Sequence, residues 1–258
     1  MRRRVAATVL IAIASLAAAS ATYGELVQVK NLRISFRGSF TPHSLPRDRP
    51  APIQVTIEGG IKTTDDTHPP VLNRLEVALN RQGRLSTKGL PTCSSGLLQS
   101  TSTEAALALC APALVGRGRF AADLDLTPGS LPAHGRALAF NGRRGGKPAL
   151  LLHFYATIPV RATLVLPLTI DHRRQGDFGT VLSTKIPKLA GGLGSITDVK
   201  LTIGRQYNDR GTPRSFISAS CAAPAGFPGA IFPFARGTFH FAQGMKVVTT
   251  LTRNCRVR

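Results

Sequence analysis

The side chains that could carry out acid–base chemistry in this chain are few and widely separated. Asp123 and Asp125 alternate in a strand-like segment, so both carboxyl groups lie on one face, a placement that a glycosidase could use. His153 stands in an apolar segment and could act as a general base, and Asp171 follows a second apolar segment. Each also has an ordinary structural interpretation, because acids can neutralise neighbouring arginines and His153 can be a packed strand residue.

The usual catalytic and cofactor-binding motifs are missing from the sequence. It contains no G-x-S-x-G elbow, H-E-x-x-H helix, P-loop or dinucleotide fingerprint. Asp65 and Asp66 could offer oxygens to Ca²⁺, but their segment lacks the spaced acids and the glycine of a calcium loop. The glycine-rich stretch 191–195 leads into a strand rather than a helix, which argues against a phosphate site. We therefore expect no metal and no cofactor.

A basic hairpin tip is the best local candidate for an anion contact. The run 141–147 is dense in turn-forming residues and should close a hairpin, and it contains Arg143, Arg144 and Lys147. The competing interpretation is that turn tips are often charged simply because they are solvated.

Four cysteines suggest two disulfides, and the sequence permits three pairings. We favour Cys93 with Cys110 and Cys221 with Cys255, because each pair closes a compact local unit. Each closure would contribute roughly 3 to 4 kcal/mol in the loop-entropy model. A metal or redox site is disfavoured, since there is no C-x-x-C and no histidine at ligand spacing.

The amino terminus has the three parts of a secretory signal peptide. The arginines at positions 2–4 precede the apolar run 5–19, and positions 19–21 offer small residues for cleavage. We expect residues 1–21 to be removed and the mature protein to be secreted or extracytoplasmic, in the cell envelope. Past the signal no apolar stretch approaches the ~20 residues of a membrane-spanning helix, so no transmembrane segment is expected.

The charge of the chain favours anionic partners. The formal net charge is +20, and removal of the three signal arginines leaves +17. Such a field attracts acidic polymers and anionic surfaces, although an arginine-rich composition also results from a high-GC genome. Nucleic acid is a disfavoured partner, because no block of consecutive basic residues occurs and tryptophan, a stacking residue, is absent.

Strand-like alternation runs through the mature chain and predicts an all-β fold. Apolar and polar residues alternate over 32–37, 53–58, 74–79, 119–126 and 199–203, while 150–156 and 161–170 are more continuously apolar. We expect an antiparallel β-sandwich of many short strands, with a bulge near Lys30 and Asn31. One short helix is expected at about 102–110, inside the first cysteine loop, where Thr101 to Glu104 has the spacing of a capping box.

Residues 22–258 are expected to form a single β-sandwich domain. The alternative is two smaller sandwiches divided near 158–160. The segments 41–52 and 204–214 are short, and strand-like sequence resumes on both sides of each, so they are interpreted as loops.

Three stretches resemble a family of uncharacterised secreted β-rich, disulfide-containing proteins of high-GC actinobacteria. They are 89–93 leading to 110–118, the hairpin 140–146, and the end of the chain from Ser220 to Arg256. The resemblance implies export and the two local cysteine pairs, and it implies no activity.

Two functions therefore remain open. The first is a non-enzymatic exported module that associates with anionic cell-surface polymers or with an envelope protein. The second is a secreted hydrolase whose site is assembled from distant loops, with Asp123, Asp125, His153 and Asp171 as its candidates. The lack of catalytic spacing favours the first, whereas a cleft lined by converging acids or histidines would favour the second.

Overall fold

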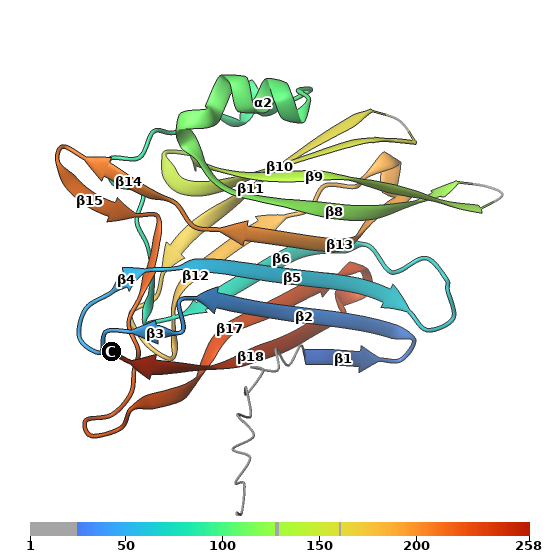
Figure 1. The fold of residues 1–258 in the computed structure, drawn as a ribbon. Helices are drawn as coiled ribbons and strands as arrows, with labels where there is room; N and C mark the ends of the chain where they lie inside the picture. Colours follow the sequence, from blue (N-terminus) through green and yellow to red (C-terminus); the bar gives the residue numbers. More distant parts are fainter. Residues whose placement is uncertain (1–24, 127–128, 160) are drawn as a thin grey trace, which may run out of the picture.

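A computed structural model describes residues 25–126, 129–159 and 161–258. The expected signal peptide, 1–21, lies outside these residues. The described chain is dominated by β-strands, and 13 of them form one large sheet (Figure 1). Neighbouring strands of this sheet are antiparallel except β18 and β3, which are parallel.

In spatial order the strands of the large sheet are β1 (Glu25–Val29), β2 (Leu32–Thr41), β5 (Gln54–Thr63), β13 (Gly194–Ile203), β8 (Leu114–Leu126), β9 (Gly129–Arg144), β10 (Lys147–Ile158), β11 (Ala162–His172), β12 (Phe178–Lys185), β6 (Leu72–Asn80), β17 (Gly229–Phe241), β18 (Lys246–Val257) and β3 (Ser44–Leu45). Two small sheets contain β14 (Gln206–Asp209) with β15 (Thr212–Ser215), and β4 (Ala51–Pro52) with β16 (Ile217–Ala219) and β7 (Gly83–Leu85). The helices are α1 (Ser95–Leu98) and α2 (Thr103–Cys110), with 3₁₀ turns at η1 (Ala111–Ala113), η2 (Ala190–Gly192) and η3 (Ala242–Gly244).

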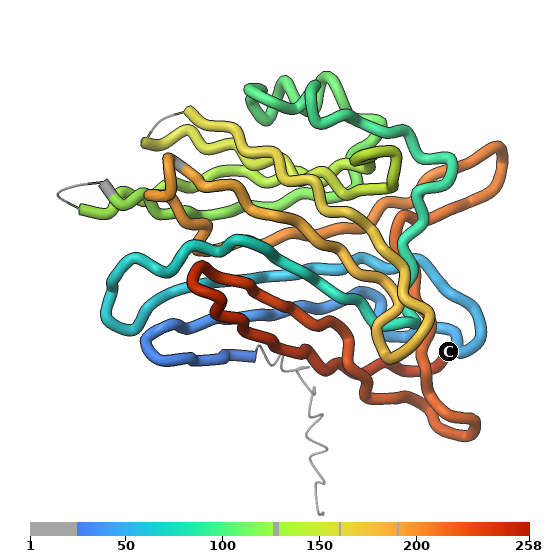
Figure 2. The backbone as a smooth tube through the Cα atoms, turned by 180° about the vertical axis from the view of Figure 1, so that it is seen from behind, coloured from blue at the N-terminus to red at the C-terminus, as the bar shows by residue number. Residues whose placement is uncertain are grey.

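The large sheet curls strongly into a half-barrel, so the expected sandwich of many short strands is wrong in its finer detail. Strands β2, β5, β13 and β8 form one wall (Figure 1), and β11, β12, β6 and β17 form the opposite wall (Figure 2). The main strands are also long, up to the 16 residues of β9. Alternation predicts which residues face the core, but it does not distinguish two packed sheets from one sheet that curls.

Two glycines lie where neighbouring backbones of the sheet approach closely. A Cβ added to Gly118 of β8 would lie 2.0 Å from the carbonyl oxygen of Lys200, and one added to Gly135 of β9 would lie 2.0 Å from that of Tyr155. Neighbouring backbone therefore occupies the space that any other residue would need, as at the bends of barrels.

The two ends of the sheet meet through side chains instead of a strand ladder. Arg253 of β18 donates from Nε to the carbonyl oxygen of Gly38 on β2 at 2.6 Å. Glu25 of β1 accepts hydrogen bonds from Thr249 Oγ1 at 2.7 Å and from the backbone N–H of Thr250 at 3.1 Å. Burial lowers the pKa of the Arg253 guanidinium, while nearby Glu25 raises it. These contacts hold β1 and β2 beside β18 at the two ends of the half-barrel.

Helices α1 and α2 cover the outer face of β9 and β10. Leu98 and Ala106 pack there with Leu138, Phe140 and Leu151, so β10 is buried on both faces as its apolar sequence indicates. The expected helix is confirmed, but its N-cap is Ser102, whose hydroxyl accepts from the N–H of Ala105. The four-residue α1 was not predicted.

The expected disulfides are present, Cys93 with Cys110 and Cys221 with Cys255. Two disulfides are consistent with an extracytoplasmic location.

Two further expectations concern chain connections. The bulge near Lys30 and Asn31 is wrong, because these residues form the tight turn between β1 and β2, with a positive φ of 54° at Lys30. Strands β10 and β11, which lie before and after the expected division near 158–160, pair directly with each other.

None of the described helices is long and apolar enough to span a bilayer.

Candidate functional site

The inside of the curled sheet contains an apolar cavity of about 160 Å³ that is partly open to solvent. Both walls contribute to it, because alternate residues of each strand point inward. The apolar side chains that line it are Phe36, Val55, Ile57, Ile61, Leu72, Leu75, Val77, Leu79, Leu85, Leu150, Leu152, Phe154, Leu166, Leu168, Leu182, Ile186, Ile196, Val199, Leu201, Ile203, Phe216, Ile217 and Phe239. The other lining residues are Gly59, Thr184, Thr197 and Asp198.

Gly59 leaves part of the interior open. It lies between Phe36 of β2 and Val199 of β13 in the strand register, at an inward-facing position of β5. A Cβ built on Gly59 would meet no heavy atom within 4 Å. The cavity therefore exists partly because this position has no side chain.

The composition of the walls decides what the cavity can hold. A buried water needs two to four polar partners, and an engineered cavity of about 150 Å³ with Leu, Ile and Phe walls stays dry and binds benzene. The present cavity is similar in volume, but it is partly open, and its mostly apolar walls also include Thr184, Thr197 and Asp198. Its walls can contact an apolar group, but they offer a water molecule few hydrogen-bond partners.

A smaller hollow of about 10 Å³ lies beside the cavity. The two share Ile61, Leu72, Ile186 and Ile196. The other residues of the hollow are Pro69, Pro70, Val71, Pro187, Leu189, Gly194 and Ser195. Ser195 lies there, and its buried Oγ has no hydrogen-bond partner in the described structure.

His153, the expected general base, is fully buried between β10 and the α1–α2 cover. Its Nε2 lies 3.1 Å from both Oγ1 and the carbonyl oxygen of Thr101. Burial lowers its pKa, with backbone hydrogen bonds acting in the opposite direction, so its neutral form is favoured. These contacts match the interpretation of His153 as a packed strand residue.

The other candidate acids lie away from His153. Asp123 and Asp125 are on β8, two strands away from His153 on β10. The residue of β8 in the same cross-strand row as His153 is Arg117, and Asp123 lies six residues further along β8. Asp171 is six residues along β11 from Val165, the partner of His153. Six strand residues span about 20 Å. The structure does not bring the four residues together, and no cluster of three or more potential metal ligands occurs among the described residues.

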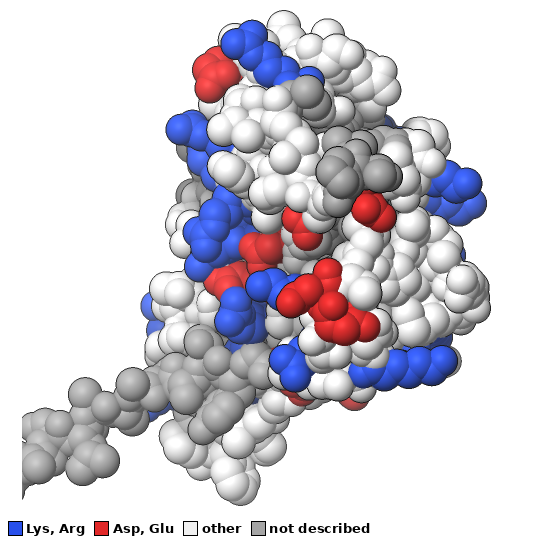
Figure 3. Space-filling view, turned by 90° about the vertical axis from the view of Figure 1, so that its right-hand side faces the viewer, with Lys and Arg blue, Asp and Glu red and all other residues white. Residues whose placement is uncertain are grey.

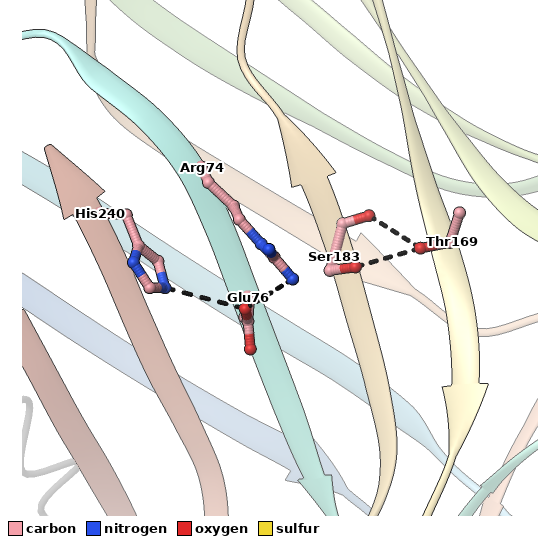
Figure 4. A network of polar contacts seen from close by, with 5 residues as sticks. All are labelled: Arg74, Glu76, Thr169, Ser183 and His240. Carbon is pink, nitrogen blue, oxygen red and sulfur yellow. Dashed lines mark hydrogen bonds and ion pairs between the residues drawn. The ribbon is translucent and has the colours of Figure 1, made fainter. Parts of the chain in front are cut away.

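A polar network on the outer face of β6 is the arrangement nearest in composition to a catalytic triad (Figure 4). Glu76 Oε1 lies 2.9 Å from Arg74 and 3.7 Å from His240 Nε2. Ser183 Oγ lies 3.0 Å from Thr169 Oγ1 instead of contacting the histidine. Ser183 and His240 are on the strands either side of β6, which lie about 10 Å apart, and they are also two residues out of row, so a serine–histidine pair is not formed.

The hairpin tip predicted as an anion contact is formed by Arg144, Gly145, Gly146 and Lys147, with positive φ at both glycines. Arg143 donates to the carbonyl oxygen of Gly146 at 2.7 Å, and Arg144 donates to that of Pro167 at 3.3 Å. Both arginines are thus partly engaged within the protein, and their role toward anions stays a prediction.

A second basic feature crosses the outer face of the wall that β2, β5, β13 and β8 form, and it extends onto β9. We define the outer row as Arg37, Glu58, Lys200, Arg119 and Arg136, which are successive cross-strand neighbours on β2, β5, β13, β8 and β9. In Figure 3, basic side chains gather along the left margin, on the side of this wall. Glu58 binds Arg37 at 3.1 Å and Lys200 at 2.6 Å. The hydrogen bond from Lys200 lowers the pKa of Glu58, while burial raises it and the positive charges of Lys200, Arg37 and Arg119 lower it further.

Sequence reasoning missed both the cavity and the outer row. The sequence signal for the cavity is Gly59, a glycine in the inward phase of Val55, Ile57 and Ile61. The row had no such signal, because its members come from five strands whose register is a property of the folded sheet. No family model, curated protein or solved structure matches this chain.

Proposed function

We propose that this protein is an exported binding protein that holds one small apolar group inside its curled sheet. The group is a ring of about the size of benzene or the end of an alkyl chain. The observation that carries the proposal is the cavity of about 160 Å³ with almost entirely apolar walls. The dispersion of Asp123, Asp125, His153 and Asp171 disfavours the hydrolase alternative.

The size of the cavity limits the affinity. Drug-sized sites measure about 300 to 1,000 Å³, so this cavity takes only part of such a ligand. Burying roughly six methylene groups contributes about 5 kcal/mol, equivalent to a Kd of about 0.2 mM. Tighter binding requires polar contacts, and the buried hydroxyl of Ser195 at the 10 Å³ hollow is a candidate for one.

The first prediction uses the open position at Gly59. Gly59→Phe should place a ring in the cavity without meeting backbone, because the site is open and the residue is in extended conformation. We expect the mature wild-type protein to bind fluorobenzene saturably in ¹⁹F NMR titrations, with octan-1-ol competing. Gly59→Phe should weaken binding at least about tenfold, since the ring takes the place of the ligand.

The matched control is Gly129→Phe, which adds the same ring at an exposed strand glycine that also has open space around it. It should bind fluorobenzene within about twofold of wild type, while Gly59→Leu offers a smaller filling if the phenylalanine prevents folding. The proposal fails if the wild type shows no saturable binding, or if the folded Gly59 variants bind as well as Gly129→Phe.

A further inference from the structure

The outer row places like charges in direct opposition on the sheet. Lys200 faces Arg119 across β13 and β8, and Arg119 faces Arg136 across β8 and β9. Like charges directly opposite each other on neighbouring strands destabilise a sheet. The arrangement therefore works against folding unless another charge balances it.

The described acids near the row, Glu58 within it and Asp198 beside Gly60 on the same outer face, leave Arg119 and Arg136 without a close carboxylate. The carboxylate of Glu58 is already held by Arg37 and Lys200. No described carboxylate lies within 4.0 Å of a nitrogen of Arg119 or Arg136, and residues 1–24, 127–128 and 160 include no acid. Glu104 of α2 acts on Arg136 only at longer range. The adjacent exposed Arg117 adds a further positive charge on the same strand as Arg119.

We propose that the outer row is a binding site for a linear anionic polymer that carries carboxylate or phosphate groups. Strands are spaced about 4.8 Å apart, so the row from β2 to β9 extends over about 19 Å. A track of this length matches several successive charges on one chain better than it matches a single small anion. Binding of a polymer to the outer row is independent of the interior cavity, because Arg119 and Arg136 lie on the opposite face of the sheet.

The chemistry of the row favours a polymer without bases. Single-stranded nucleic acids are held by aromatic side chains on which the bases stack. The outer row ends beside Tyr155 of β10, the partner of Arg136, and the chain has no tryptophan. The row thus offers charge and spacing with a single aromatic neighbour, which suits an acidic polysaccharide or a polyphosphate chain.

The test compares two pairs of arginines with equal charge. Arg119→Gln with Arg136→Gln removes two charges from the row and keeps much of each aliphatic stem, while Arg143→Gln with Arg144→Gln removes two from the hairpin tip. Binding of the mature protein to polygalacturonate and to long-chain polyphosphate is measured by titration over a series of salt concentrations. We expect the row variant to bind both polymers roughly tenfold more weakly, with a shallower salt dependence, and the tip variant to bind within about twofold of wild type.

An equal or larger loss of polymer affinity in the tip variant would overturn the proposal, and so would wild-type binding that does not change with salt. It would also fail if inorganic phosphate competed as well as polyphosphate, or if an oligodeoxythymidine bound much more tightly than either polymer. Preference between polygalacturonate and polyphosphate assigns the anion as carboxylate or phosphate.

Two further readouts separate binding from folding. Because the row variant relieves repulsion, its Tm should equal or exceed that of wild type. Glu58→Gln removes the one acid of the row and should strengthen polymer binding about twofold or more. A folded Glu58→Gln protein that binds either polymer more weakly would contradict the proposal.

Discussion

At the scale of single residues, Glu58 makes a testable contribution to stability. Its folded pKa is lowered chiefly by the hydrogen bond from Lys200. Its stabilising effect is therefore fully present above the unfolded pKa, about 4.3, and is lost as pH falls through the lower folded pKa. We expect Glu58→Gln to reduce the free energy of unfolding at pH 7 by about 0.5 to 1 kcal/mol, and the difference to shrink below pH ~4.

Denaturant unfolding at a series of pH values measures this difference. Asp171→Asn is the control, because Asp171 is exposed at the end of β11, and its effect should stay within about 0.5 kcal/mol. A loss for Glu58→Gln that stays constant from pH 7 to pH 3 would show that the carboxylate charge is not its cause.

Single residues also show what the sequence can and cannot predict about the sites. His153 is a packed residue, as its apolar segment favours, and its Nε2 lies within hydrogen-bond distance of a hydroxyl and a carbonyl group. Arg119 lies in a segment predicted as a strand from the sequence, whereas Arg136 lies outside the predicted segments. That they oppose each other depends on the register of β8 and β9, which period-two alternation leaves undetermined.

At the scale of elements, the α1–α2 cover depends on the disulfide between Cys93 and Cys110. The bridge closes a loop with a sequence separation of 17 around both helices, and the helices are too short to be stable alone. Cys93→Ala with Cys110→Ala should lower the free energy of unfolding by about 3 kcal/mol. It should also make His153 and Phe140 solvent-accessible before the sheet unfolds, because the cover packs on both.

Hydrogen exchange with mass spectrometry checks this prediction in peptides from β10 and α2. Cys221→Ala with Cys255→Ala is the comparison, since that bridge, with a separation of 34, lies outside the cover and should cost about 4 kcal/mol without exposing β10 selectively. Uniform exchange across the molecule in the Cys93 and Cys110 variant would contradict a separate cover.

The elements themselves were largely predictable, and their assembly was not. The alternation over 32–37 correctly separates the buried Leu32, Ile34 and Phe36 from their polar neighbours, and the turn at Gly145 and Gly146 follows from glycine conformational freedom. The close approach of Gly118 to the backbone of Lys200 could not be predicted, because it depends on which strand lies alongside. A sandwich and a half-barrel share the same strand pattern.

At the scale of the whole molecule, export is the remaining prediction. The basic, apolar and small residues of 1–21 occur in the order of a cleavable signal, and the two disulfides are consistent with an oxidising compartment. Mass spectrometry of the protein recovered from the culture medium or envelope should find an amino terminus at Thr22 and a mass four hydrogen atoms below that of the reduced chain. An intact Met1 on a membrane-held product would refute cleavage.

The position of β13 in the sheet determines the order in which the molecule can fold. Strands β8 to β12 pair with their sequence neighbours. By contrast, β5 pairs with β13, which follows much later in the sequence. Local hairpins close quickly and distant pairings slowly, so we expect the β8–β12 meander to form first and the β5–β13 ladder to form late. Until then one edge of β5 has unpaired backbone groups that can pair with another chain. The risk of aggregation is therefore greatest during this interval. The cavity has no complete wall before Gly194–Ile203 joins the sheet, so an apolar ligand can be captured only once folding is nearly finished.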